Sequence, residues 1–241
     1  MPGYAAGVHQ ESPQDMTIHI GLLLFPKVQQ LDLTGPYEVF ASLPGTRVDL
    51  VAASLAPVVA ATGLVLTPTI TFTDCPPLDV LCIPGGDGVN ALLTDAETLA
   101  FIRRQAAGAR YVTSVCTGAL VLGAAGLLRG RRATTHWRAH DLLAAFGAIP
   151  VQGRVVRDGN LLTGGGVTAG IDFALELVAE LAGRPAAEAI QLNLEYAPAP
   201  PFNAGRPETA PPEVLAALLQ RRAASGAERK ALVAAITAQA S

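Results

Sequence analysis

The sequence predicts a single α/β domain in which helices cover a doubly wound, mostly parallel sheet. Residues 18–24 and 79–83 form short, continuous apolar runs, typical of strands that are buried on both faces. Helical segments such as residues 91–106 alternate with these runs. With 241 residues, of which 50% are hydrophobic and 15% charged, the chain can bury a large core. These three observations favour one compact α/β domain.

The first helix is expected to follow the first strand closely. Pro36 suits the first turn of a helix, and Thr34 just before it can serve as its cap. Asp32 would then lie in the loop at the carboxyl edge of the sheet, where open α/β folds place their sites. The elements expected further along are a strand at 47–53, a hairpin at 57–70, a strand at 79–83, helices at 91–106 and 138–146, a hairpin at 154–163 that closes the sheet, and helices at 171–182 and 185–196.

Residues 111–128 are the stretch around which the chain is organised. The β-branched and aromatic residues at the beginning of this stretch predict a buried strand, and the Ala, Leu and Gly residues that follow predict a helix. Cys116 lies at the junction, where the free amides and dipole of the helix favour an anion, here a thiolate. The Ser-Val-Cys-Thr-Gly sequence takes the place of the Gly-x-Ser-x-Gly nucleophile elbow. The alternative is that Cys116 simply fills a gap in the core.

Three loops that follow strands should meet at one edge of the sheet. They carry Asp32, the glycine-rich turn at residues 85–88, and Cys116. A thiolate, a carboxyl group and free backbone amides are the parts required for nucleophilic catalysis with acid–base help. Two alternatives stay open: Asp32 could only cap the first helix, and the glycine turn could be a plain connector.

Other motifs do not indicate a cofactor or a metal. The glycine-rich residues 164–170 have the wrong spacing and position for a dinucleotide loop, so a close-packed turn is favoured. His136 and His140 have zinc-helix spacing but lack the glutamate and a third ligand. His136 could instead act as a base toward Cys116, and spacing leaves this open.

Composition limits the setting and the partners. The formal net charge of −3, with no long Lys/Arg block, does not favour nucleic-acid binding. Three cysteines do not suggest a disulfide framework, which favours a reducing, cytoplasmic location. Cys75 and Cys82 are expected to be inert residues of the core. No apolar run is long enough to span a membrane. We expect a flexible leader at 1–16, the α/β domain at 17–200, and a Pro-rich arm with terminal helices at 201–241.

Several motifs together resemble the ThiJ/PfpI superfamily, also described as class I glutamine-amidotransferase-like. They are Pro-Gly-Gly-Asp-Gly at 84–88, Val-Cys-Thr-Gly-Ala at 115–119, Gly-Leu-Leu-Arg-Gly at 126–130, Ala-Thr-Thr-His-Trp at 133–137 and Thr-Gly-Gly-Gly at 163–166. The resemblance runs from about residue 18 to 207. It implies a flavodoxin-like three-layer sandwich with a cysteine nucleophile elbow. Residues 30–36 and 194–205 look most like members that hydrate isonitriles.

The resemblance also implies roles for individual residues. Cys116 would be a nucleophile in a strained conformation, and Asp32 the general acid and base in place of a more common glutamate. Amides of Gly86 and Thr117 would form an anion pocket, with help from the Thr117 hydroxyl. Asp87 and Val167 would contact the substrate. The implied reaction converts a small apolar isonitrile into an N-substituted formamide through a thioimidate, requires no metal or redox cofactor, and takes place in a homodimer.

Two other functions fit parts of the pattern. Transcriptional regulators of this superfamily join a similar domain to a helix-turn-helix pair, but only about forty Ala-rich residues follow Pro201, so a ligand-binding domain alone is the form expected. Glyoxalases or deglycases that need no cofactor share Cys116. In those enzymes a glutamate occupies the position of Asp32, and a histidine commonly occupies the position of Thr117.

Overall fold

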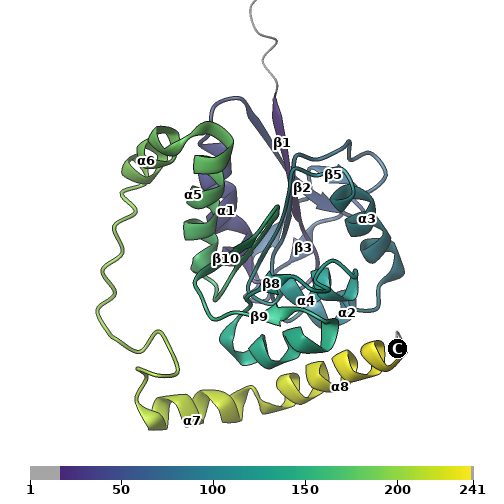
Figure 1. The fold of residues 1–241 in the computed structure, drawn as a ribbon, viewed down its shortest axis with the longest axis vertical. Coiled ribbons are helices and arrows are strands. Elements are labelled where there is room, and N and C mark those ends of the chain that lie inside the picture. The colour runs from purple at the N-terminus through teal and green to yellow at the C-terminus, as the bar shows by residue number, and fades with distance from the viewer. Residues whose placement is uncertain (1–16, 240–241) are drawn as a thin grey trace, which may run out of the picture.

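The computed structural model describes residues 17–239, so the predicted leader at 1–16 lies outside the described residues. Its centre is a seven-stranded sheet in the order β10-β11-β7-β6-β1-β2-β5, with every neighbouring pair parallel except β10 and β11 (Figure 1). The strands are β1 Ile18–Leu23, β2 Thr46–Ala52, β5 Ile70–Thr71, β6 Val80–Ile83, β7 Tyr111–Val115, β10 Val155–Asp158 and β11 Leu161–Gly164. Two small ribbons pair β3 Val58–Val59 with β4 Val65–Leu66, and β8 Arg132–Ala133 with β9 Ile149–Pro150.

Helices cover both faces of this sheet. The helices are α1 Gln30–Ala41, α2 Val89–Leu92, α3 Ala96–Ala106, α4 Gly118–Ala124, the 3-10 helix η1 Trp137–Phe146, α5 Ala169–Ala182, α6 Arg184–Asn193, α7 Pro212–Arg221 and α8 Ala223–Gln239. Figure 1 shows α1 and α5 on one face and α2, α3 and α4 on the other. The predicted doubly wound, three-layer α/β fold is therefore confirmed.

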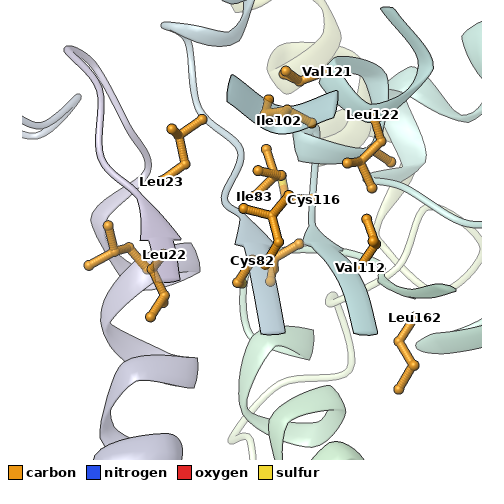
Figure 2. Packing of buried hydrophobic residues seen from close by; sticks show 14 of the residues in the cluster. Leu22, Leu23, Cys82, Ile83, Ile102, Val112, Cys116, Val121, Leu122 and Leu162 are labelled. Atoms are coloured by element: carbon orange, nitrogen blue, oxygen red, sulfur yellow. The ribbon is translucent and has the colours of Figure 1, made fainter. Parts of the chain in front are cut away.

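The core lies between the sheet and these helix layers. Leu22 and Leu23 of β1 point to opposite faces of the sheet and are both buried, as a strand covered on both faces requires. Between α1 and α5, Phe40 and Phe173 pack edge to face, with ring centroids 5.9 Å apart. Figure 2 shows Cys82 of β6 within the packed side chains, and Cys82 is fully buried, as predicted. Cys75 is half-buried, and both thiols are free.

The predicted start of the first helix is wrong. Helix α1 begins at Gln30, so Asp32 lies in its first turn and Pro36 lies inside the helix. The Thr34 hydroxyl donates to the Gln30 side chain and caps nothing. Pro36 is tolerated because α1 packs closely on α5: a Cβ at Gly170 would lie 3.0 Å from the Pro36 ring. Tertiary packing here overrides the local preference of proline.

Smaller differences concern element boundaries. The helix predicted at 91–106 is divided into α2 and α3, because Asp95 takes an extended conformation and accepts a hydrogen bond from the Thr98 hydroxyl. The helix predicted at 138–146 is a 3-10 helix, which ends at Gly147 with a φ of 74°. The short strands β5, β8 and β9 were not predicted, because two residues carry no readable periodicity.

The C-terminal segment runs along the outside of the domain. After an irregular stretch at 197–211, α7 and α8 lie end to end beside η1 (Figure 1). Val233 of α8 is 1% exposed, and Lys230 pairs with Asp141 of η1 at 2.8 Å. Within residues 17–239, no helix has the length and apolarity to cross a membrane. The division of the chain at residue 200 stays a prediction.

Candidate active site

Cys116 lies at a sharp turn between β7 and α4. Its φ is 54°, a left-handed conformation that costs a non-glycine residue about 1–2 kcal/mol. The backbone is held there because the Cys116 amide donates to the carbonyls of Gly164 (3.1 Å) and Gly165 (2.9 Å), while the Thr135 hydroxyl donates to its carbonyl at 2.6 Å. Gly118 also has no room for a side chain, since a Cβ would lie 2.0 Å from a β6 carbonyl oxygen. The elbow predicted from the sequence is therefore present, with its strained residue.

Asp32 enters the same region from the first turn of α1. Its side chain is fully buried, and Oδ2 accepts a hydrogen bond of 3.0 Å from the Gly85 amide. Among the described residues, the other oxygen, Oδ1, has no well-formed hydrogen-bond partner. A buried carboxyl oxygen without a donor is uncommon. It leaves one face of Asp32 available to the Cys116 thiol, with which the carboxyl interacts.

The glycine-rich turn after β6 connects these two residues. Gly86 has a φ of 143°, and its amide donates to the Thr117 hydroxyl at 3.1 Å. A Cβ at Gly85 would lie 2.6 Å from the Thr117 nitrogen and 2.8 Å from Oδ2 of Asp32. Asp32, the glycine-rich turn and the elbow therefore meet as predicted, although Asp32 lies in the first turn of α1 and not in a loop. The Gly86 amide, however, is engaged by Thr117, so its predicted place in an anion pocket requires the hydroxyl to be displaced.

Burial has the largest effect on the pKa values of Asp32 and Cys116. It raises the pKa of Asp32 to about 7, although the hydrogen bond from the Gly85 amide and the interaction with the Cys116 thiol oppose the rise. Burial also raises the pKa of the Cys116 thiol, and the neighbouring Asp32 charge raises it further. Burial and the Asp32 charge therefore oppose the thiolate that the sequence predicts at the start of helix α4, and the resting thiolate stays a prediction. The two groups cannot both be ionised near neutral pH, so they share at least one proton.

A cavity of about 600 Å³ lies beside the elbow. Val167 lines it, together with Thr135 and Gly165, which hold the Cys116 backbone, whereas Cys116 and Asp32 are not among its lining residues. The substrate contact of Val167 stays a prediction. Residues 205–208 of the C-terminal arm form another part of its wall. Asp87 does not line this cavity; its carboxylate pairs with Arg222 of the C-terminal segment at 3.3 Å.

His136 also lines the cavity. Burial and the nearby Arg138, Arg229 and Arg222 lower its pKa to about 4, so the imidazole is neutral and a weak base. Its Nδ1 accepts a hydrogen bond from the Arg138 amide at 3.2 Å, which makes Nδ1 an N-cap of η1. Within residues 17–239, no three His, Cys, Asp or Glu side chains are grouped closely enough to hold a metal ion.

Sequence reasoning missed two groups near the elbow. Arg229 of α8 donates to the carbonyl of Gly86 at 3.2 Å, and Arg138 of η1 interacts electrostatically with Cys116. Arg138 lies between His136 and His140 but was not itself singled out, and Arg229 is outside every motif and 113 positions from Cys116 along the chain. The Arg229-Lys230 pair in an Ala-rich helix has the pattern of a solvent-exposed charged face, so the sequence gives no signal of such a contact.

Fold and site together define a doubly wound α/β protein with a cysteine elbow facing a buried carboxyl group. Comparison with known proteins identifies the family to which this chain belongs. The chain belongs to the DJ-1/PfpI family, which it matches over residues 19–180.

Individual relatives extend this assignment. The chain is 66% identical to the isonitrile hydratase of Pseudomonas putida over 87% of this chain and 92% of that protein. A crystal structure of a ThiJ/PfpI family protein from Pseudomonas syringae superposes with a TM-score of 0.87 and 47% identity, covering 96% of this chain and 98% of the other. The HTH-type transcriptional regulator GbdR of Pseudomonas aeruginosa is 30% identical over 81% of this chain and 55% of its own length.

Proposed function

We propose that this protein is an isonitrile hydratase, which adds water to an isonitrile and releases an N-substituted formamide. The observation that carries the proposal is the pairing of a strained, buried Cys116 with an Asp32 oxygen that has no well-formed hydrogen bond among the described residues. High identity to the Pseudomonas putida isonitrile hydratase, over nearly the whole length of both chains, supports the same activity here.

The first half of the proposed cycle forms a carbon–sulfur bond. Transfer of the shared proton from sulfur to Asp32 creates the thiolate and a neutral acid together, which the raised pKa of Asp32 favours. A sulfur lone pair attacks the terminal isonitrile carbon, and that carbon takes the proton from Asp32. The product is a thioimidate on Cys116, with Asp32 now ionised.

The second half releases the product. Ionised Asp32 takes a proton from water, whose oxygen attacks the thioimidate carbon, and the nitrogen takes that proton as the C=N electrons move to it. The resulting hydroxyl group then gives its proton to Asp32 while the carbon–sulfur bond breaks. Formamide leaves, and the thiolate and neutral acid are restored. The Thr117 amide interacts with the Cys116 sulfur and lowers the thiol pKa, so it stabilises the sulfur anion at both ends of the cycle.

The remaining parts of the proposal concern substrate, assembly and location. The substrate is a small apolar isonitrile held near Val167, with Gly86 and Thr117 around the reacting atoms and Asp87 further out. The protein works without a cofactor, as a cytoplasmic homodimer in which the 201–241 arm contributes to the interface. Light scattering during size-exclusion chromatography measures the assembly directly.

A second candidate function comes from the likeness to the regulator GbdR, which extends over 81% of this chain. On that alternative, the cavity binds a ligand without converting it. The two are distinguished by turnover, because a binding domain leaves an isonitrile unchanged.

Turnover of an aryl isonitrile, followed by chromatography of the formamide, tests the proposal. Wild-type protein should produce the formamide, and Cys116→Ala should not. Cys75→Ala is the matched control, since Cys75 is a free, half-buried thiol outside the elbow. Formamide formation by Cys116→Ala, or none by wild type, would reject the proposed function.

A further inference from the structure

Arg229 on α8 is a buried charge to which the proposed cycle assigns no role. It is only 8% exposed, although arginine is rarely buried unless its donors are bonded. Its Nε donates to Oδ1 of Asn90 at 2.7 Å, and a terminal nitrogen donates to the carbonyl of Gly86 at 3.2 Å. Both acceptors are neutral, and among the described residues no carboxylate forms an ion pair with Arg229. Burying a cation among neutral acceptors costs desolvation free energy, which an interaction with a nearby negative charge can offset.

One acceptor, Gly86, lies in the turn that builds the active site, and the other, Asn90, lies in helix α2 directly after it. Gly86 is held from both sides, because its carbonyl accepts from Arg229 while its amide donates to the Thr117 hydroxyl. The adjacent Gly85 amide donates to Asp32. Asn90 follows in α2, so Arg229 joins the turn that contacts Asp32 and Thr117 to the helix that comes after it. Movement of this turn would change the position of both side chains.

The Arg229 charge also lies near the elbow, because Arg229 hydrogen-bonds Gly86, and Gly86 in turn hydrogen-bonds Thr117, the residue after Cys116. Arg229 and Cys116 interact electrostatically, and a cation near sulfur favours the thiolate. The other charged groups that face the thiol are Asp32 of α1, which opposes ionisation, and Arg138 of η1, which favours it. Asp87 and Glu228 are acidic groups that interact with Arg229, and Arg138 and His136 are basic groups that do so.

We propose that Arg229 is a positioning residue of the active site, which fixes the Gly85–Gly86 turn against Asp32 and Thr117 and favours the thiolate form of Cys116. Helix α8 is then a functional part of the site, although it lies outside the family match at 19–180. The inference deepens the proposed function and rests on it for turnover. The effect on the thiol is measurable without any isonitrile.

The test compares Arg229→Met and Arg229→Lys with Lys230→Met. Lys230 is the matched control, because it is the neighbouring cation on α8 and holds α8 to η1 through Asp141, whereas Arg229 holds α8 to the turn and to α2. The rate of Cys116 alkylation by iodoacetamide is measured against pH in a Cys75→Ala background. We expect the midpoint of Arg229→Met to rise by about one pH unit. Arg229→Lys should keep most of the wild-type midpoint, and Lys230→Met all of it.

Turnover gives the second measurement. Displacing the turn should lower kcat of Arg229→Met by about 10–100-fold with a smaller change in KM, because positioning errors of about 1 Å have such effects. Asn90→Ala removes one anchor, keeps the charge and provides a second variant if Arg229→Met does not fold. It should lower kcat with little change in the alkylation midpoint.

Specific outcomes would overturn the inference. An Arg229→Met midpoint equal to that of Lys230→Met would reject the effect on the thiol, and unchanged kcat in both Arg229→Met and Asn90→Ala would reject the positioning role. If wild type alkylates with the expected profile but turns over no isonitrile, the proposed function fails while the role of Arg229 in tuning the thiol stands.

Discussion

Asp32→Asn should make the protein more stable and less active at the same time. Asp32 is fully buried, and burial raises its pKa from 3.8 to about 7. A rise of about three units corresponds to about 4 kcal/mol of free energy. A group whose pKa is raised by folding reduces stability as pH increases from about 4 to 7, because the unfolded chain loses the proton before the folded one. Asparagine cannot ionise, so it avoids this loss.

The expected increase in the free energy of unfolding is smaller than the about 4 kcal/mol that corresponds to the pKa rise. Asparagine can still accept the hydrogen bond from the Gly85 amide, but its NH₂ group would replace Oδ1, which has no well-formed hydrogen bond among the described residues. A buried donor without a good acceptor costs about 1–3 kcal/mol. We therefore expect the free energy of unfolding at pH 8 to increase by about 1–3 kcal/mol. Near pH 4 the gain should vanish, leaving only the cost of the amide.

Urea unfolding at pH 4 and pH 8 measures this difference. Asp49→Asn is the matched control: although burial raises the pKa of Asp49, hydrogen bonds from His19, Thr69 and Arg47 lower it below its usual value. A lowered pKa stabilises the fold above the unfolded value, so Asp49→Asn should lose stability at pH 8. Turnover by Asp32→Asn should fall about 10²–10⁴-fold, the usual effect of losing a general acid and base. An active Asp32→Asn variant, or one less stable than wild type at pH 8, would refute the reasoning.

Three further predictions follow from the same contacts. For wild type, kcat/KM should rise with pH up to about 7, as the Asp32–Cys116 pair loses its first proton; a profile that is flat from pH 5 to 8 would contradict the shared proton. Thr117→Val should lower kcat/KM by about tenfold and reduce Tm, since the Gly86 amide loses its acceptor, whereas Thr117→Ser should keep both. Gly85→Ala should abolish turnover, because a Cβ would lie 2.6 Å from the Thr117 nitrogen, while Gly108→Ala, with nothing within 4 Å, should not; an active Gly85→Ala would show that the turn adapts.

Much of the fold was predictable because buried strands carry a strong local signal. The apolar runs before Pro26 and Pro84 correctly located β1 and β6. The start of α1 was missed because a proline near a possible cap usually marks a first turn, whereas Pro36 lies mid-helix against Gly170. That contact joins segments more than 130 positions apart, and local pattern contains no information about it.

The site was predictable to the extent that strand ends share one edge. Cys116, Asp32 and the Gly85–Gly86 turn each follow a strand, so topology alone brings them together. Their ionisation was not predictable, because the pKa of the Cys116 thiol depends on burial by distant elements. Arg229 was missed for the same reason: docking of α8 is a property of the assembled structure.

The most direct measurement is the mass of the protein trapped during turnover. Wild type mixed with an excess of aryl isonitrile and quenched in acid within milliseconds should gain the mass of one isonitrile, and peptide mapping should place that mass on Cys116. Asp32→Asn should form formamide far more slowly than wild type, and Cys116→Ala should gain no mass. Rapid formamide production with no mass gain on wild type, or a gain on any residue other than Cys116, would contradict the covalent pathway through this thiol.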